Sequence, residues 1–411
     1  MNETPHIVDV VVIGAGVAGI AACIAAKNSG ASVLLIDKNT HLGGKATHAE
    51  VGTICGVYYT GNVEDPHFLV KGFAKEFTQR LFQKSNIPLQ SNSKGLLYLP
   101  YKMDDFKSLC DELITENEIA VLKATVTAVQ KETNSISAII ATNEKDTLTI
   151  VPKMVIDCSG NAIVSHLLEL PLIQDDNYQA ASQVVVFNNI THTSEMNLQL
   201  ALIHQLKKGV LEGKIQDDTI AFHLVPGSLE NGFASFKWTL PFEVNFKNAN
   251  DPHLKLKLQK ILSTIVQYLN DSNEYFKHLS IHHIAEQIGW RIAPRGVGKT
   301  ILTEKEVLDG TKFQTAIAAS SWPVEFWDKE KGLQIKYIAN NDFYQIPAAC
   351  LESNYISNLF FGGSTISADK GAIASARVMG VCLQTGYAAG ALAAGKINSK
   401  TLDETLDQLC F

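Results

Sequence analysis

The sequence has few charged residues and no concentration of either sign. Charged residues make up 19% of the 411 positions, below the usual share of about 25%, while 46% are apolar. The formal net charge is −7 and no basic stripe appears, which argues against a nucleic-acid binder. We therefore expect a globular protein with a sizeable core, built as two or three domains or one large interleaved domain.

Two further patterns are missing from the sequence: a regular spacing of cysteines and the features of a signal peptide. The 7 cysteines are scattered and never form C-x-x-C, so we expect no disulfide framework, zinc site or iron–sulfur cluster, and no other metal. The N-terminal stretch MNETPHIVDVVVIGAG lacks the basic region, apolar stretch and cleavage site of a signal peptide. A reducing, cytoplasmic location is the expectation.

One apolar stretch, AIASARVMGVCLQTGYAAGALAAG (372–395), has almost the length of a membrane span. It contains Arg377 and Gln384, however, and it is dominated by Ala and Gly rather than by Leu, Ile or Val. These features favour a buried helix in close contact with another element, and we expect no membrane association.

A glycine-rich loop follows the first apolar strand. VDVVVI (8–13) leads into GAGVAG, which places Gly14, Gly16 and Gly19 at G-x-G-x-x-G spacing before an Ala-rich helix. A second strand, 33–36, ends at Asp37, where a carboxylate can accept hydrogen bonds from a ribose. This β-turn-α-β unit predicts a dinucleotide site with the pyrophosphate at the helix N-terminus.

The rest of the chain predicts an α/β protein: a doubly wound, Rossmann-like domain with an inserted α+β substrate domain. Helical periodicity covers 67–84 and 104–116, and three β-rich runs (119–132, 136–143 and 147–157) form a meander. The predicted domain limits are 1–165 (with a helical excursion at 67–116), 166–343 for the substrate domain, and 344–411. Within the insert we expect strands at 183–190 and 233–240, and helices at 195–213 and 251–270.

NAD and FAD both fit the glycine-rich unit, and a family resemblance favours FAD. Four stretches carry it: GAGVAG with Asp37, LGGKATHAEVG (42–52), MVIDCSGNA (154–162) and NLFFGGSTISADKGAIASARVMGVCLQTGYAAG (358–390). In this order they resemble FAD-dependent oxidoreductases of the glutathione-reductase-like FAD fold, near the fumarate reductase and succinate dehydrogenase flavoproteins. Residues 172–285 share no such likeness.

The resemblance implies where the chain meets FAD. Small residues at 159 and 160 let the chain approach the cofactor a second time, after the glycine-rich loop. The Gly362–Gly363 pair meets the ribityl and pyrophosphate region of the cofactor. The family often has an acid or Arg just after that pair, where this chain has Ser364. The predicted cofactor contacts are Gly14, Gly16, Val17, Ala18, Gly19, Asp37, Lys38, Gly44, Lys45, Val126, Ser159, Gly160, Gly363, Ala372 and Ile373.

A helix N-terminus can stabilise negative charge on reduced flavin. By the resemblance, Ala372–Ala376 form that N-terminus, and their small side chains permit close approach. Arg377 either adds positive charge, contacts the substrate or pairs with a nearby carboxylate.

Three further residues are candidates for catalysis. His48, in THAE, resembles the context of the histidine that attaches FAD covalently in succinate dehydrogenase-type proteins; a noncovalent pocket residue and a structural histidine are the alternatives. Tyr344 and Lys370 complete the predicted pocket. The family commonly has His near position 370, and a lysine acts as a base only when it is desolvated; a solvated surface lysine is the alternative.

The stretch GWRIAPRGVGKT (289–300) almost matches a phosphate-binding P-loop. Ala293 replaces the first glycine and no clear strand precedes it, so we reject that interpretation. Arg291 and Arg295 are candidates to bind a substrate carboxylate through bidentate hydrogen bonds, although either could form a structural ion pair. Thr303 and Glu306 predict a capping box for the next helix.

Together these features predict an FAD-dependent oxidoreductase, a dehydrogenase or oxidase, that transfers hydride from a small organic substrate, which could be an anion, to flavin N5. The sequence has a single dinucleotide fingerprint, so the substrate itself is expected to reduce the flavin. The alternatives are a flavin monooxygenase or halogenase-like enzyme with an external electron donor, and a non-catalytic flavin-binding protein. The expected partner is a small molecule, and the chain could form a homo-oligomer.

Overall fold

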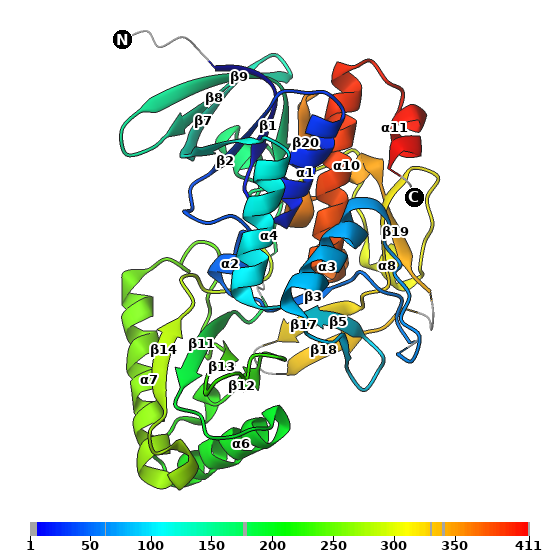
Figure 1. The fold of residues 1–411 in the computed structure, drawn as a ribbon. Helices are drawn as coiled ribbons and strands as arrows, with labels where there is room; N and C mark the ends of the chain where they lie inside the picture. Colours follow the sequence, from blue (N-terminus) through cyan, green and yellow to red (C-terminus); the bar gives the residue numbers. More distant parts are fainter. Residues whose placement is uncertain (1–5, 62, 176–178, 329–330, 339–341, 410–411) are drawn as a thin grey trace.

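The computed structural model describes residues 6–61, 63–175, 179–328, 331–338 and 342–409. Its central sheet has the strand order β6-β2-β1-β9-β8-β7, with β20 paired to the carboxyl end of β9 (Figure 1). The strands are His6–Ile13 (β1), Val33–Asp37 (β2), Ala120–Lys123 (β6), Thr125–Glu132 (β7), Ser135–Thr142 (β8), Thr147–Asp157 (β9) and Leu359–Phe361 (β20). The predicted α/β fold with a parallel Rossmann-like sheet is confirmed.

Strand β1 lies between β2 and β9 and is parallel to both. Val10 and Val12 point into one hydrophobic core, and Val11 and Ile13 point into another on the opposite face. A strand covered on both faces needs apolar residues at every position, which explains the unbroken run in the sequence. The helix predicted after it is α1, Val17–Asn28.

The meander expected at 119–157 forms with one correction. Strands β7, β8 and β9 pair antiparallel as predicted, but the run 119–132 is two strands rather than one. Its first part, β6, pairs in parallel with β2 on the opposite edge of the sheet. The chain turns at Ala124, whose N–H donates to the carbonyl of Asp37.

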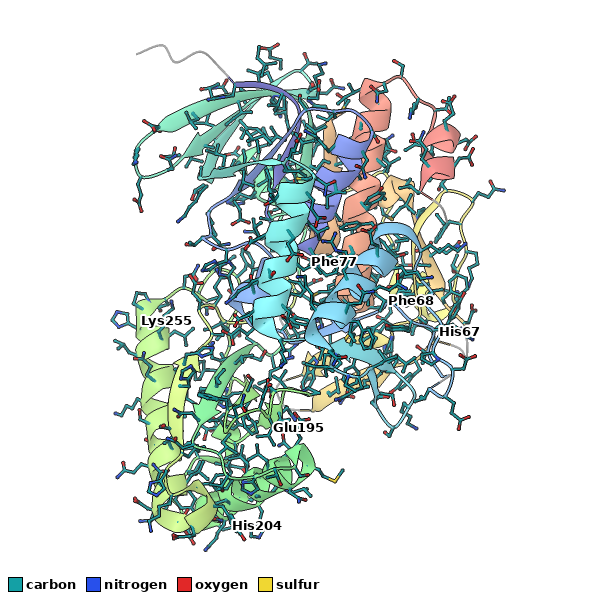
Figure 2. The ribbon with its side chains drawn as sticks, viewed as in Figure 1. His67, Phe68, Phe77, Glu195, His204 and Lys255 are labelled. Carbon is teal, nitrogen blue, oxygen red and sulfur yellow. The ribbon has the colours of Figure 1, made fainter. Side chains whose placement is uncertain are left out.

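Two amphipathic helices, α3 (Gly72–Ser85) and α4 (Met103–Glu116), cover the core. Phe77 of α3 is fully buried against Phe106 of α4, with ring centroids 5.6 Å apart, and Figure 2 marks its position between these helices. Helix α3 starts five residues later than the predicted residue 67. The reason is that Phe68 pairs with Tyr58 in an isolated antiparallel bridge, which keeps 67–70 extended.

A second unit has its own sheet, in the antiparallel order β12-β13-β11-β14. Its elements are Ser182–Asn188 (β11), Glu195–Leu211 (α6), Phe222–Leu224 (β12), Ala234–Thr239 (β13), Pro252–Ser272 (α7) and Ser280–Ile284 (β14). They enclose a separate hydrophobic core that includes Trp238 and Phe236. Figure 1 shows α6 and α7 flanking this sheet at the end of the molecule away from the central sheet.

The chain from about 292 onward packs on the first core, to which Ile292, Leu302 and Ile317 belong. The substrate domain predicted at 166–343 remains a prediction, and this packing favours narrower limits. The capping box of Thr303 and Glu306 is confirmed at the start of α8.

The remaining elements are α2 (Lys45–His48), α5 (Ile163–Leu167), α8 (Glu304–Leu308), α11 (Leu402–Gln408), β3 (Thr53–Cys55), β4 (Gln90–Ser91), β5 (Leu97–Pro100), β10 (Leu172–Ile173), β15 (Arg295–Gly296), β16 (Ala316–Ser320), β17 (Val324–Asp328), β18 (Gly332–Lys336) and β19 (Tyr344–Pro347).

The long helix predicted at 372–395 is two helices, α9 (Lys370–Ala376) and α10 (Met379–Ile397). Val378 between them is extended, with φ −69° and ψ 153°. Over the described residues no single helix is long and apolar enough to cross a membrane. The α9–α10 pair meets that test only when taken together, and it bends by 96° at its break.

Helix α10 is almost entirely buried, as predicted, and it packs directly on the backbone of α1. A Cβ atom at Gly386 would lie 2.1 Å from the carbonyl oxygen of Ala18, and one at Gly390 would lie 2.1 Å from that of Ala22. The two glycines therefore set the distance between the helices. Figure 1 shows the pair side by side next to the central sheet.

This contact predicts that Gly390→Ala destabilises the protein. Helix propensity alone would stabilise the variant by about 1 kcal/mol, whereas the clash with backbone costs about 1–3 kcal/mol or more. We expect a lower melting temperature for the purified protein by thermal denaturation. The matched control is Gly395→Ala in the same helix, because the nearest neighbours of its added methyl would be side-chain atoms of Thr405 rather than the backbone of another helix. A Gly390→Ala protein as stable as this control would contradict the packing.

Candidate functional site

The glycine-rich loop after β1 packs against the end of β9 and leaves its other side open. Gly14 has φ +101°, and a Cβ there would lie 2.4 Å from the carbonyl oxygen of Cys158. Gly16 is different, because the nearest atom to its Cβ position is the Cα of Gly44 at 4.0 Å. Gly16 is also the N-cap of α1, and no side chain caps this helix. The first N–H groups of α1 are therefore available to an anion.

Asp37 closes the loop from the end of β2. Its carboxylate accepts hydrogen bonds from the backbone N–H of Ala15 at 2.6 Å and of Asn39 at 2.7 Å. A carboxylate has about four acceptor positions, so lone pairs remain for a ligand hydroxyl. Asp37 and the neighbouring Lys38 both line the cavity described below.

A second glycine pair brings Lys45 to the same place. The N–H of Gly43 donates to the carbonyl of Ala15 at 2.8 Å, and a Cβ at Gly44 would lie 2.8 Å from the Cα of Gly16. Lys45 follows, and its Nζ lies 3.2 Å from the ring centroid of Trp290. Burial lowers the pKa of Lys45 well below its ordinary value.

Strand β9 ends in small residues, and the turn that follows the strand shows why. The buried Asp157 accepts hydrogen bonds from the Ser159 hydroxyl at 2.6 Å and from the Val164 N–H at 2.9 Å, which fixes the turn. Burial raises the pKa of Asp157. Gly160 has φ +82°, a conformation that favours glycine. Ser159 and Gly160 then line the cavity beside the loop of Gly14.

A third approach comes from the end of β20. A Cβ at Gly362 would lie 2.8 Å from the sulfur of Cys158. Gly363 has φ +68°, and its N–H donates to the Thr385 hydroxyl of α10 at 3.0 Å. The four stretches that carried the resemblance thus meet at the carboxyl ends of β1, β2, β9 and β20.

These segments line one cavity of about 450 Å³, within the range of about 300–1,000 Å³ that ligand pockets have. The predicted cofactor contacts that line it are Gly14, Gly16, Val17, Ala18, Asp37, Lys38, Gly44, Lys45, Ser159, Gly160 and Gly363. Four other predicted contacts, Gly19, Val126, Ala372 and Ile373, are not among its lining residues.

Gly19 and Val126 have packing roles instead. A Cβ at Gly19 would lie 1.8 Å from the carbonyl oxygen of Gly14, so this glycine lets α1 pack on its own loop. Val126 pairs with Ala141 in the antiparallel meander and is buried in the core on the other face of the sheet.

Ala372 and Ile373 are displaced from the cavity because α9 is closed at its start. The Asp369 carboxylate accepts from the N–H of Ala372 at 2.8 Å and also from the N–H of Glu304. The helix N-terminus at the cavity is that of α10, where Val378 and Met379 line the wall. No side chain caps α10. The open helix N-terminus at this cavity is therefore that of α10, and not the predicted one at residues 372–376.

The inner end of the cavity holds a cluster that we call the basic chamber: Lys237 of β13, Arg291 after β14, Arg377 at the end of α9, and Glu325 of β17. The Arg291 guanidinium stacks on the ring of Trp327 at 4.8 Å and donates to the carbonyl of Ala180. Burial, with a smaller contribution from Arg377, lowers the pKa of Arg291 to about 9. Burial also lowers the pKa of Lys237 and of Arg377.

Sequence reasoning missed several residues of this inner end: Lys237, Trp290, Trp322, Glu325 and Trp327. One signal was available for Lys237. In the alternating strand FASFKWTL, Phe236 and Trp238 are buried on the core face. A lysine between them must point to the opposite face, which here is the cavity.

The structure does not bring His48 to the cavity. It is 2% exposed, and its Nδ1 lies 2.7 Å from the Glu286 carboxylate while its Nε2 lies 2.9 Å from the carbonyl of His41. This contact lowers the pKa of Glu286. Both ring nitrogens are engaged with protein, which favours the structural role among the three alternatives.

Tyr344 and Lys370 are also absent from the cavity lining. The Tyr344 hydroxyl is fully buried 2.8 Å from the Ser375 hydroxyl, and burial raises its pKa. Lys370 opens α9, with its Nζ 4.7 Å from the Phe326 ring centroid. Of the four residues predicted for catalysis, Arg377 alone lines the cavity.

The two predicted substrate arginines have different surroundings. Arg295 is fully buried, and its guanidinium donates to Asp175 at 2.8 Å and to the carbonyls of Ala368 and Ala293. It is not a cavity residue, so the ion-pair alternative holds for it. Arg291 does line the cavity.

Solved structures of flavin enzymes resemble this chain at low identity. A geranylgeranyl bacteriochlorophyll reductase-like protein from Thermoplasma acidophilum shares 12% identity over 99% of this chain and 83% of its own, with a TM-score of 0.47. A flavoprotein/dehydrogenase from Cytophaga hutchinsonii shares 13% over 96% and 80%, with a TM-score of 0.44. The myxobacterial chondrochloren halogenase CndH shares 13% over 98% and 78%, with a TM-score of 0.42.

No curated protein matches the sequence. A family match does cover almost the whole chain, from residue 9 to residue 408. It spans the glycine-rich loop, the ends of β9 and β20, and α10. The chain belongs to the FAD dependent oxidoreductase family.

Proposed function

We propose that this FAD-dependent oxidoreductase oxidises a small organic substrate held in the basic chamber. The observation that carries the proposal is the continuity of the cavity, because one lining joins the Gly14 loop and Asp37 to Lys237, Arg291 and Arg377. When bound, the flavin supplies the redox chemistry by accepting hydride at N5. The protein supplies binding, orientation and electrostatics.

The residues present fit FAD. The first turn of α1 is uncapped and open at Gly16, as binding of a pyrophosphate requires. Asp37 retains acceptor positions for a ribose. Gly160 and Gly363 both have positive φ and line the wall without side chains, so the backbone can approach a large cofactor.

Electrostatics support an oxidising role for the site. The open N-terminus of α10 carries partial positive charge, and so do the uncapped N–H groups of α1. Positive charge on these walls favours the electron-rich state that a cofactor reaches when it accepts hydride.

The electron donor in this proposal is the substrate itself. The sequence has one G-x-G-x-x-G fingerprint, and α1 already uses it. We propose a dehydrogenase or oxidase, with oxygen or another acceptor completing the cycle. A place near the fumarate reductase flavoproteins, a cytoplasmic location and a homo-oligomer remain predictions.

One prediction of this proposal tests the cofactor cradle, by which we mean the glycine-rich loop and the open first turn of α1. Gly16→Val places its Cβ 4.0 Å from the nearest protein atom, the Cα of Gly44, so the variant should fold. It should lose FAD affinity by about tenfold or more, because one steric conflict costs about 1–3 kcal/mol. FAD binding is measured by quenching of flavin fluorescence, and folding by circular dichroism. Gly14→Val is the contrasting variant and should fail to fold, because its Cβ meets the Cys158 carbonyl. Normal FAD affinity in folded Gly16→Val would reject this cradle.

The second prediction concerns the linkage to FAD. His48 is committed to Glu286 and His41, so we expect noncovalent FAD. Acid precipitation of the yellow protein should leave flavin absorbance in the supernatant. Colour that stays in the pellet would show a covalent bond and return His48 to the list of candidate attachment sites.

The third prediction tests the reaction. Under anaerobic conditions, a panel of small alcohols, amines and organic acids should include a compound that bleaches the visible absorbance of the oxidised flavin. NADH and NADPH should not bleach it, because no second nucleotide fingerprint is present. Bleaching by NADPH alone would favour the monooxygenase or halogenase alternative. No bleaching by any compound would favour a non-catalytic flavin-binding protein.

A further inference from the structure

The basic chamber contains more positive than negative charge, and its cations lack carboxylate partners. Lys237, Arg291 and Arg377 face one acid, Glu325. Within the described ranges, none of the three cations forms an ion pair with a carboxylate, in contrast to Arg295 with Asp175. Partly buried cations without carboxylate partners are costly, so a structural role alone does not account for this arrangement.

We propose that the basic chamber binds the oxyanion group of the substrate, with Lys237 as a direct ligand. This inference rests on the proposed function, because it places the substrate in the same cavity as the cofactor. The chemistry recognised is a compact group with negatively charged oxygens, either a carboxylate or a phosphate-type group. Lys237 and the guanidinium groups supply N–H donors to such oxygens.

Unpaired donors at the chamber are the independent observation. The indole N–H of Trp322 and the Nε–H of Arg377 have no hydrogen-bond partner among the described residues. Trp322 is only 8% exposed, and both residues line the cavity. A buried donor left unsatisfied is costly. Both groups can only donate, but each of the two atoms exposes less than 1 Å², so an acceptor oxygen reaches them only when neighbouring side chains move.

Among the described residues, Gln179 is the side chain that accepts a hydrogen bond from Arg377. Its side-chain oxygen accepts from the Arg377 Nη2 at 3.3 Å and from the backbone N–H of Trp327 at 3.3 Å. Two donors fix the orientation of the amide, so its nitrogen must point the other way, and this nitrogen is also unpaired. The protein's acceptor at this point is used, while further donors remain.

The cations also affect one another directly. Burial lowers the pKa of Lys237, Arg291 and Arg377 lower it further, and Cys55 and Glu325 partly oppose them. Burial and then Lys237 lower the pKa of His223. Below its pKa the lysine is charged and can bind an anion. We therefore expect anion affinity to fall as pH rises through this lowered value, earlier than for an exposed lysine.

The test measures anion binding to the FAD-loaded protein by isothermal titration calorimetry, with sodium acetate and inorganic phosphate as probes at constant ionic strength. Lys237→Met should weaken binding of the accepted probe by about tenfold or more, because a hydrogen bond to a charged group contributes about 1.5–3 kcal/mol. Lys207→Met is the matched control: this lysine is exposed on α6, away from the cavity, and the variant should bind like wild type. Binding of acetate alone identifies a carboxylate site, and binding of phosphate alone identifies a phosphate-type site.

A stability readout separates the proposal from a folding defect. Without anion, Lys237→Met should melt at or above the wild-type temperature, because it removes a desolvated charge that two neighbouring cations repel. The accepted anion should raise the melting temperature of wild type and of Lys207→Met, but not that of Lys237→Met. Equal anion binding by wild type and Lys237→Met, or no binding of either probe by wild type, would overturn the proposal.

Neither readout requires turnover, so the two proposals can fail separately. A protein that binds FAD and anion but is reduced by no compound would lose the proposed function and keep the oxyanion site. A protein reduced by a neutral substrate, with anion affinity unaffected by Lys237→Met, would keep the function and lose the site.

Discussion

Close backbone contact at the carboxyl end of the central sheet is the constraint on which the rest of the structure depends. Three loops meet there, and the space between the Gly14 loop, Cys158 and Gly362 has no room for additional side chains. Parallel strands place these loops at one edge. The same condition extends into the helices, because Gly386 and Gly390 bring α10 onto the backbone of α1. Two uncapped helix N-termini consequently reach one cavity.

Local patterns made this part of the fold predictable. The spacing of Gly14, Gly16 and Gly19, with Asp37 at the end of the next strand, depends on contacts within one β-α-β unit, and sequence periodicity reports such contacts directly. The capping box of Thr303 and Glu306 is local in the same sense. Prediction failed at 372–395, where composition favours one helix. The Asp369 cap and extended Val378 produce two helices, and composition does not encode that choice.

The basic chamber could not be read from local patterns, because its members come from different elements that only the tertiary fold brings together. Arg291 and Arg295 show the difficulty. They lie four residues apart in one motif, and the same role, binding a substrate carboxylate, was predicted for both. Arg295 finds Asp175 and two backbone carbonyls inside the protein. Arg291 finds the face of Trp327 and an open cavity. The sequence shows that each arginine can bind an oxyanion. It cannot show which arginine already has its hydrogen-bond donors occupied by groups of the protein.

Positive groups lie at both ends of the cavity of this acidic chain, whose net charge is −7, but the two ends owe part of that charge to different sources. At the cofactor end the charge comes from helix N-termini, whose peptide dipoles do not titrate. At the inner end it comes from side chains, including Lys237, whose pKa burial lowers. Rising pH therefore leaves the helix N-termini unchanged, while it discharges Lys237 and also Lys45, whose pKa burial lowers too. The share of the positive charge that comes from peptide dipoles is thus insensitive to pH, whereas the share that comes from side chains is not.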